Sequence, residues 1–259
     1  RPRRQQLAEP MIADGVLDHR ADFGRLAALA ERQVMRDDHR LEPRAAPHPV
    51  DKEAVGQFHG HADHERGLIQ AVTDAAKLGA VKFVANIAGL QHIDSIDNFP
   101  MEKYDLMQRL MLRAPFLISK LTIPHMRKSA DGVGVIGHMA SIHAHICTRN
   151  KPVYNITKFG LRALAQSISA EGEGKIRSFT VSTGFIKTPL ALNQIPAQAA
   201  QRGITPEEVV RDVMLGKSRI KEMMDPVEAA NIFIYGFSRY AKYLIGGDLL
   251  FDGGVVLTY

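Results

Sequence analysis

Apolar residues follow two alternating patterns along the chain from about residue 66 onward. Short, continuous apolar runs bounded by turn residues predict buried strands over residues 80–89, 132–141, 176–186 and 246–254. Longer segments with apolar residues at helical spacing predict helices over residues 66–79, 101–128, 153–172, 205–216 and 225–238. Strands that alternate with helices form βαβ units with right-handed crossovers. The pattern therefore predicts an α/β protein in which helices cover both faces of a parallel sheet.

Several helix boundaries are marked by individual residues. Gly79 ends the first of these helices, while Thr205 and Asp225 each precede a proline and then acidic residues, as N-caps prefer. Pro115 lies inside the predicted helix 101–128. We expect it to kink that helix, because proline cannot donate the backbone hydrogen bond.

The first 55 residues differ in amino-acid composition from the rest of the chain. They are rich in arginine, aspartate, histidine and proline, and residues 23–34 (FGRLAALAERQV) have helical spacing. The best strand candidate before them, PMIADGVL at residues 10–17, is weak. A chain of 259 residues can form one large α/β domain or two small ones. We expect a single domain over residues 1–259, with residues 1–55 as an atypical N-terminal segment.

The composition narrows the functional classes. Hydrophobic residues make up 45% and charged residues 24%, as in soluble globular proteins, and no apolar run reaches the ~18 residues of a membrane span. The single cysteine, Cys147, excludes an intramolecular disulfide, and the start RPRRQQLAEP lacks the apolar core of a secretory signal, so we expect a cytoplasmic protein. The net charge of +5 is scattered along a chain without tryptophan, which argues against nucleic-acid binding and favours attraction for small anions.

Ser141, Tyr154 and Lys158 are the strongest candidates for catalysis. Ser141 follows a predicted strand, and Tyr154 and Lys158 are four residues apart on the next helix, so they share one face. Ligands bind at the carboxyl ends of the strands in such folds. A phenol becomes a usable base when a lysine ammonium nearby lowers its pKa, and a serine hydroxyl can hold the oxygen of a reacting alcohol. The arrangement suits hydride transfer, although a Tyr–Lys pair at this spacing is by itself common on helix surfaces.

Ser141 and four short motifs resemble the short-chain dehydrogenase/reductase family. The motifs are NIAG (86–89), YNITK (154–158), TGFIKT (183–188) and DGG (252–254). The resemblance covers about residues 55–259 and implies a Rossmann-type doubly wound parallel sheet, a nicotinamide cofactor and a homotetramer. By matched position it implies that the cofactor is bound by Asp63 at the adenine, by Asn86, Ala88 and Gly89 along the cleft, by Tyr154, by Lys158 at the nicotinamide ribose and by Thr188 at the carboxamide.

A narrower resemblance is to the bacterial D-3-hydroxybutyrate dehydrogenases of this family. It is carried by residues 88–105, 151–158, 188–195 and 199–215. It implies a pocket for the substrate carboxylate, formed by Gln91, His143, Lys151 and Gln194. The chemistry agrees, because a lysine ammonium and an imidazolium can neutralise a carboxylate while two amides donate hydrogen bonds. The insert 189–222 is where the family has its substrate lid, so Gln194 is expected to meet the substrate when the lid closes.

The resemblance therefore implies an NAD-dependent oxidoreductase, with NADP as an open alternative. It would transfer hydride between the cofactor and a small 3-hydroxy acid, foremost (R)-3-hydroxybutyrate, with acetoacetate as the oxidised partner. In this scheme Tyr154 is the base, Lys158 is its electrostatic partner and Ser141 holds the reacting oxygen.

Two departures from the family pattern support a rival hypothesis. The glycine-rich turn that approaches the cofactor pyrophosphate falls on residues 14–22, where Gly15 alone fits. The other glycine positions hold Val16, Arg20 and Asp22. The asparagine that holds a water in the family's proton relay is Met111 here, which predicts slower proton exchange. The departures fit a dehydrogenase fold that has lost catalysis and acts as a subunit or small-molecule binder, or an enzyme with an altered segment 1–55.

A metal site is a further alternative. The segment HGHADH brings His59, His61, Asp63 and His64 close together, and on a strand His59 and His61 would share one face. The same segment matches the family's strand that ends in the adenine-contacting aspartate, which argues against zinc.

Overall fold

A sheet of four parallel strands forms the centre of the protein. The structure is a computed structural model that describes residues 53–257, and the side chains of residues 65–257 apart from 197 and 201. The strands are β1 (Phe83–Asn86), β2 (Gly134–Met139), β3 (Ile176–Thr183) and β4 (Asp248–Phe251), and they lie in the order β1-β2-β3-β4. Each of the four strands falls within a predicted apolar run, so the parallel sheet is confirmed.

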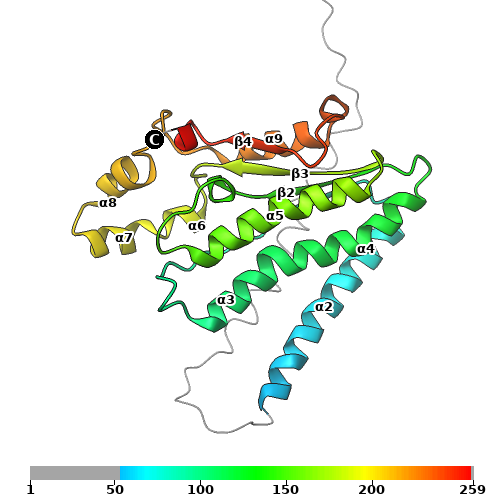
Figure 1. The fold of residues 1–259 in the computed structure, drawn as a ribbon, viewed down its shortest axis with the longest axis horizontal. Helices are drawn as coiled ribbons and strands as arrows, with labels where there is room; N and C mark the ends of the chain where they lie inside the picture. The colour runs from blue at the N-terminus through cyan, green and yellow to red at the C-terminus, as the bar shows by residue number, and fades with distance from the viewer. Residues whose placement is uncertain (1–52, 258–259) are drawn as a thin grey trace, which may run out of the picture. The chain divides into compact units, whose positions relative to one another are not determined.

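Helices cover both faces of this sheet. One face carries α4 (Ala114–Lys128) and α5 (Pro152–Glu171), with α2 (Glu53–Leu78) packed beside α4 (Figure 1). The other face carries α9 (Pro226–Phe237), which contacts β2 and β3. The predicted doubly wound α/β architecture is therefore present.

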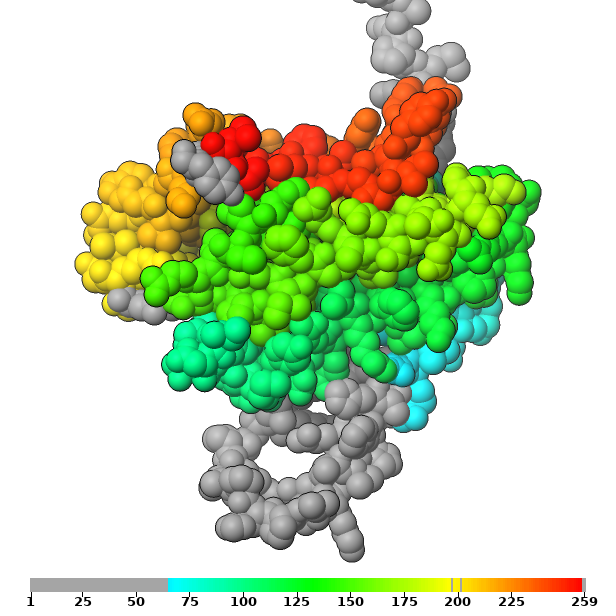
Figure 2. Space-filling model, viewed as in Figure 1, coloured from blue at the N-terminus to red at the C-terminus, as the bar shows by residue number. Residues whose placement is uncertain are grey.

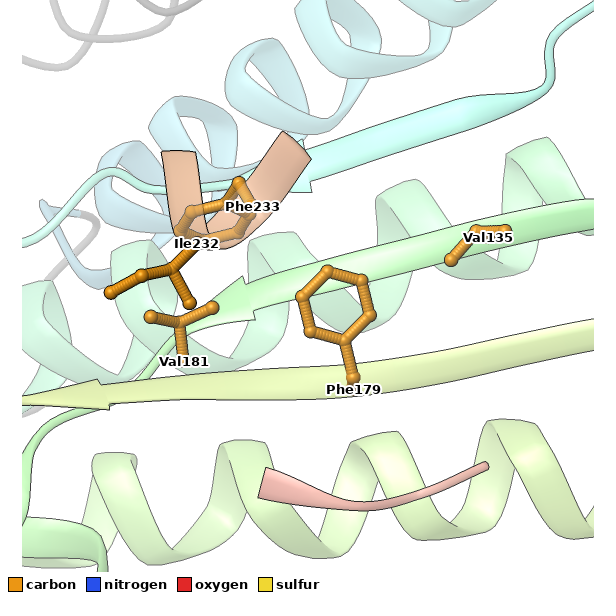
Figure 3. Close-up of a cluster of buried hydrophobic side chains, with 5 residues drawn as sticks. All are labelled: Val135, Phe179, Val181, Ile232 and Phe233. Atoms are coloured by element: carbon orange, nitrogen blue, oxygen red, sulfur yellow. The ribbon is translucent and has the colours of Figure 1, made fainter. Parts of the chain in front are cut away.

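The face toward α9 is closed by an aromatic and aliphatic cluster. Figure 3 shows Phe179 and Val181 of β3 directed at Ile232 and Phe233 of α9. The helix approaches closely because of Gly236, where a Cβ atom would lie 2.3 Å from the ring of Phe179. Burying such side chains stabilises the fold by roughly 1.5–3 kcal/mol each.

The face toward α4 and α5 changes from apolar to polar along the strands. Near the strand starts, Ile136 and Ile176 pack with Met126 of α4 and Ile168 of α5. Two residues further along β2, and on the same face, the fully buried side chain is His138. Buried polar side chains near the carboxyl ends of strands mark a site rather than a simple core.

The predicted long helix 101–128 is interrupted by a wider turn. It consists of α3 (Met101–Gln108), the π-helical turn η1 (Arg109–Arg113) and α4. The N–H of Ala114 donates to the carbonyl of Arg109, five residues back. Pro115 follows directly and has no N–H to donate, so the regular ladder cannot continue. The kink expected at Pro115 thus takes the form of a π-turn, and Met111 lies inside it.

The strand predicted over residues 59–64 is wrong, because these residues lie in α2. The segment contains alanine, histidine and acidic residues but no β-branched ones, so local propensity does not favour a strand. The strand assignment depended on the family match and not on periodicity. The end of α2 at Leu78, before Gly79 at a φ of 159°, agrees with the prediction.

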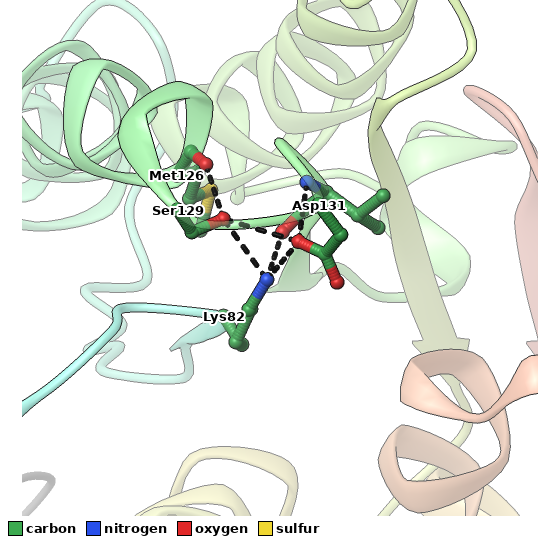
Figure 4. A network of polar contacts seen from close by, with 5 residues as sticks. Lys82, Met126, Ser129 and Asp131 are labelled. Carbon is green, nitrogen blue, oxygen red and sulfur yellow. Dashed lines mark hydrogen bonds and ion pairs between the residues drawn. The ribbon is translucent and has the colours of Figure 1, made fainter.

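A polar network ties the amino ends of β1 and β2 together, at the end of the sheet opposite the predicted site. Lys82 pairs with Asp131 and donates to Ser129 Oγ at 2.9 Å (Figure 4). The hydrogen bond from Lys82, with that from the N–H of Val133, lowers the pKa of Asp131 to about 2. The network closes the turn between α4 and β2.

The predicted lid follows β3 and consists of short helices. They are α6 (Pro189–Leu192), α7 (Ile195–Arg202), α8 (Pro206–Glu208) and the π-turn η3 (Val209–Met214). In Figures 1 and 2 this yellow and orange group lies beyond the arrowhead of β3. The caps predicted at Thr205 and Asp225 are present as capping boxes, closed by Glu208 and Glu228. Within residues 53–257, no helix is long and apolar enough to span a membrane.

Candidate active site

The chain turns sharply where β2 ends, and this turn places Ser141. Ser141 is 8% exposed and has extended backbone, and it is followed by the 3-10 turn η2 (Ile142–Ala144). Its Oγ lies 3.1 Å from Nδ1 of His143, whose Nε2 lies 2.9 Å from Oγ1 of Thr148. The serine hydroxyl is therefore held in one place by a side chain that is itself held.

Tyr154 and Lys158 enter the same space from the first turns of α5. Pro152 occupies the first turn of this helix, where its missing N–H has no cost. The ring of Tyr154 meets the ring of His143 edge-on, with centroids 5.3 Å apart. Lys158 is 2% exposed, and its Nζ donates to the carbonyl of Met139 at 2.7 Å. The structure thus brings Ser141, Tyr154 and Lys158 together at the carboxyl end of β2.

The electrostatics of the pair differ from the sequence-based expectation. Burial raises the pKa of Tyr154 to about 12, and a hydrogen bond with Ser141 lowers it only in part. Burial also lowers the pKa of Lys158 to about 8. The Nζ of Lys158 lies over the ring of Tyr154, 5.2 Å from its centroid, and donates to a backbone carbonyl. Desolvation therefore outweighs the attraction that was expected to lower the pKa of the phenol.

His143 is neutral, so the imidazolium considered for the carboxylate pocket is wrong. Burial lowers the pKa of His143 to about 3, and the ammonium groups of Lys151 and Lys158 lower it further. A neutral ring suits its position between two hydroxyls, because one ring nitrogen can donate and the other can accept. His143 consequently orders Ser141 and supplies no charge.

Lys151 is the cation of the predicted carboxylate pocket. It is the N-cap residue of α5, half-buried, with Nζ 5.9 Å from the ring centroid of Phe185. Burial and, to a lesser degree, repulsion from Arg202 lower the pKa of Lys151 to about 8. Among the described residues no carboxylate pairs with it. A desolvated ammonium without a counter-charge is a site for an anion.

Buried polar atoms without a hydrogen-bond partner include atoms of two predicted pocket residues. Within the part of the chain whose side chains are described, they are Gln91 Nε2, His92 Nε2, His138 Nε2, Asn155 Oδ1 and Gln194 Oε1. Gln91 and Gln194 are predicted pocket residues, and His92 and Asn155 adjoin Gln91 and Tyr154 in sequence. Each such atom costs about 1–3 kcal/mol unless a ligand or water satisfies it. Those on Gln91 and Gln194 leave one donor and one acceptor available to a polar ligand.

The sequence analysis missed three of these residues, which are His92, Asn155 and His138. Asn155 lies inside the YNITK motif, so its position beside the tyrosine was visible. His138 looked like an ordinary strand residue, and the register that pairs it with Asn86 on β1 appears only in the sheet. Its Nδ1 lies 3.2 Å from Nδ2 of Asn86.

The residues predicted to hold the nicotinamide half of a cofactor fit that role. Lys158 has three N–H donors, and one of them is used by Met139. Gly89 packs against Lys158 and Met111, since a Cβ there would lie at van der Waals distance from both, 3.9 Å from Lys158 Nζ and 3.6 Å from Met111 Sδ. Thr188 stands extended before α6, and Ala88 adjoins Gly89 at the end of β1. The side chain of Asp63 and the turn at 14–22 lie outside the described residues, so their roles stay predictions.

The argument for a metal site assumed a strand at residues 59–64, and these residues lie in the helix α2 instead. The face that a strand would give His59 and His61 therefore cannot support a metal site. Their side chains, with those of Asp63 and His64, lie outside the described set. The described side chains contain no group of three or more residues that could hold a metal ion.

Comparison with known proteins agrees with this arrangement. The family model described as Enoyl-(Acyl carrier protein) reductase matches residues 21–256. The D-beta-hydroxybutyrate dehydrogenase of Rhizobium meliloti is 31% identical over 70% of this chain and 69% of its own, and that of Cupriavidus necator is 27% identical over 69% of each. The sorbitol-6-phosphate 2-dehydrogenase of Erwinia amylovora superposes with a TM-score of 0.69, at 25% identity, over 74% of this chain and 75% of its own. The chain belongs to the short-chain dehydrogenase/reductase family of oxidoreductases.

Proposed function

We propose that the protein is an NAD-dependent dehydrogenase of small 3-hydroxy acids, with (R)-3-hydroxybutyrate as the preferred substrate. The observation that carries this proposal is the uncompensated ammonium of Lys151, together with the buried Nε2 of Gln91, a donor that lacks a partner. A small carboxylate would satisfy both donors. Similarity to two D-beta-hydroxybutyrate dehydrogenases supports the same substrate class.

In this proposal, residues of the chain bind and orient the substrate, and they move one proton. Lys151 and Gln91 hold the carboxylate, and Gln194 joins them when lid closure turns its Nε2 away from the carbonyl of Leu190. His143 keeps the hydroxyl of Ser141 directed at the substrate oxygen. Lys158 stabilises the phenolate of Tyr154, which takes the proton from that oxygen and becomes a neutral phenol. The cofactor, bound along Asn86, Gly89 and Thr188, supplies the hydride acceptor. Because burial raises the pKa of Tyr154 to about 12, Lys158 must provide more stabilisation during reaction than it does at rest.

The remaining parts of the proposal concern the whole protein. Residues 1–259 are proposed to form one domain in which residues 189–222 close over the substrate, with NADP as the alternative cofactor. A single exposed thiol, Cys147, fits a cytoplasmic protein. We propose a homotetramer, supported by apolar side chains on exposed faces. These are Phe116, Ile156 and Phe159 on α4 and α5, the helices coloured green in Figures 1 and 2, and Ile234, Tyr235, Leu250 and Phe251 on α9 and β4.

A second candidate function is a catalytically impaired subunit or small-molecule binder. It is favoured by Met111, which is 1% exposed and whose sulfur faces Gly89 where the family has an amide. Calorimetric titration with NADH followed by turnover of 3-hydroxybutyrate separates the two. Micromolar binding with turnover supports the dehydrogenase. Binding without turnover, or no binding by a folded protein, supports the impaired protein and contradicts the dehydrogenase.

A further inference from the structure

A buried carboxylate that the proposed mechanism does not use lies beside the turn after β2. Asp248 begins β4, and its side chain is 7% exposed. Thr180 and Ser182 of β3 donate to its Oδ1, and Nε2 of His145 lies 2.8 Å from its Oδ2. Three donors on one carboxylate in a sheet core make a fixed acceptor, because neither oxygen is free to turn.

His145 is held at both of its ring nitrogens. Its Nδ1 lies 3.4 Å from Nη1 of Arg162 on α5, and the same nitrogen of Arg162 donates to the carbonyl of Ala144 at 2.7 Å. A guanidinium has no acceptor, so Nδ1 must accept and Nε2–H must donate to Asp248. One neutral tautomer satisfies both partners, and the ring is thereby fixed between α5 and β4.

The residues held in this way belong to the turn that carries the catalytic serine. The N–H of Ala144 donates to the carbonyl of Ser141, and that of His145 donates to Ile142, each at 2.8 Å. His143 in the same turn contacts Ser141 Oγ at 3.1 Å. Residues 141–145 therefore move as one hydrogen-bonded unit, and a displacement of His145 displaces His143 and the Ser141 hydroxyl.

We propose that Asp248, acting through His145, positions the turn that carries Ser141 and His143 for the hydride-transfer step. The two residues are 103 positions apart, so the last strand of the sheet anchors a turn that follows the second. Neither side chain is placed against the substrate or cofactor, so both are positioning residues. The catalytic part of this inference rests on the proposed function, and its structural part does not.

The kinetic test compares two substitutions of one residue. His145→Leu removes both ring nitrogens, and it should lower kcat about 10- to 100-fold, because a misplacement of about 1 Å costs up to about 100-fold. His145→Gln retains an amide that can donate to Asp248, and it should keep kcat within about threefold of the wild type. The KM for the hydroxy acid and the Kd for NADH should stay near wild-type values in both. His125→Leu, at an exposed position near the end of α4, is the matched control and should have full activity.

A second measurement does not depend on turnover. The imidazole ¹⁵N resonances of His143, assigned by their loss in His143→Gln, should shift in His145→Leu and stay in place in His145→Gln, with similar melting temperatures. Unchanged His143 resonances in His145→Leu would overturn the proposal. The proposal would also be overturned if both variants lost the same share of activity and this loss matched the fall in their melting temperatures. A wild-type protein that oxidises no 3-hydroxy acid contradicts the proposed function alone, and the His143 resonances then decide this inference.

Discussion

Replacing Lys151 with methionine tests the carboxylate pocket through its pH dependence. The shift in the pKa of Lys151 from 10.5 to about 8 corresponds to at most about 3 kcal/mol of unfavourable charging, less what solvent screens. A substrate carboxylate offsets this cost, so binding favours the protonated amine. Below pH 8 Lys151 is charged before substrate arrives, and above pH 8 it must first take up a proton.

Because binding favours the protonated amine, the KM should depend on pH. In the wild-type protein the KM for 3-hydroxybutyrate should rise about tenfold for each pH unit above 8, because the charged fraction falls by that factor. In Lys151→Met the KM at pH 7 should be roughly 10- to 100-fold higher, the value of a charged hydrogen bond of about 1.5–3 kcal/mol. It should not rise further above pH 8. The kcat should change little, since the carboxylate does not react.

Steady-state kinetics from pH 6 to pH 10 (a range of about four units centred on this pKa) measure both parameters. Lys128→Met, at the exposed end of α4 near the strand starts, is the matched control and should follow the wild type. The reasoning is refuted if Lys151→Met keeps the wild-type KM, or if its KM profile still rises above pH 8 as steeply as that of the wild type.

Three further predictions address the buried charge of Lys158, the hydrophobic core and the cofactor cleft. Lys158→Met should abolish turnover yet raise the free energy of unfolding at pH 7 by about 1–2 kcal/mol in urea denaturation, because burial lowers the pKa of Lys158 to about 8 and penalises its charge. That gain should fall between pH 8 and pH 10.5 and vanish above pH 10.5, where the wild-type amine is neutral in both the folded and the unfolded state. An unstable variant contradicts this prediction. Phe179→Ala should cost about 3–5 kcal/mol of stability with normal activity per folded molecule, and a loss under 1 kcal/mol (about one methylene) would contradict the packing in Figure 3. Gly89→Val should weaken NADH binding more than about tenfold in calorimetry at unchanged melting temperature, and unaltered affinity would remove Gly89 from the cleft.

The strands and their order of appearance were predictable from short runs rich in apolar residues, most of them next to glycine. The central strands β2 and β3 are buried almost throughout, whereas the edge strands β1 and β4 are partly exposed. Helix starts at Thr205 and Asp225 were equally visible, since capping depends on residues three positions apart. Strands and helix caps depend on residues that are close together in the sequence, so a single sequence is enough to predict them.

Other features depend on tertiary context that a sequence does not display. The segment at residues 59–64 took a strand assignment from the family match, although its own composition does not favour a strand. The pKa of Tyr154 depends on how far burial opposes Lys158, and spacing alone predicted the wrong direction. The pair of His145 and Asp248 spans 103 residues and has no local signal.

The central claim is that Tyr154 serves as the proton acceptor in the oxidation of a small 3-hydroxy acid. The most direct measurement is NADH formation from NAD and (R)-3-hydroxybutyrate by the wild-type protein and by Tyr154→Phe, at equal concentrations of folded protein. The account predicts steady turnover by the wild type and a loss of at least about 100-fold in Tyr154→Phe, the contribution of a general base, with NADH affinity retained. Turnover by Tyr154→Phe at a near wild-type rate would contradict the account.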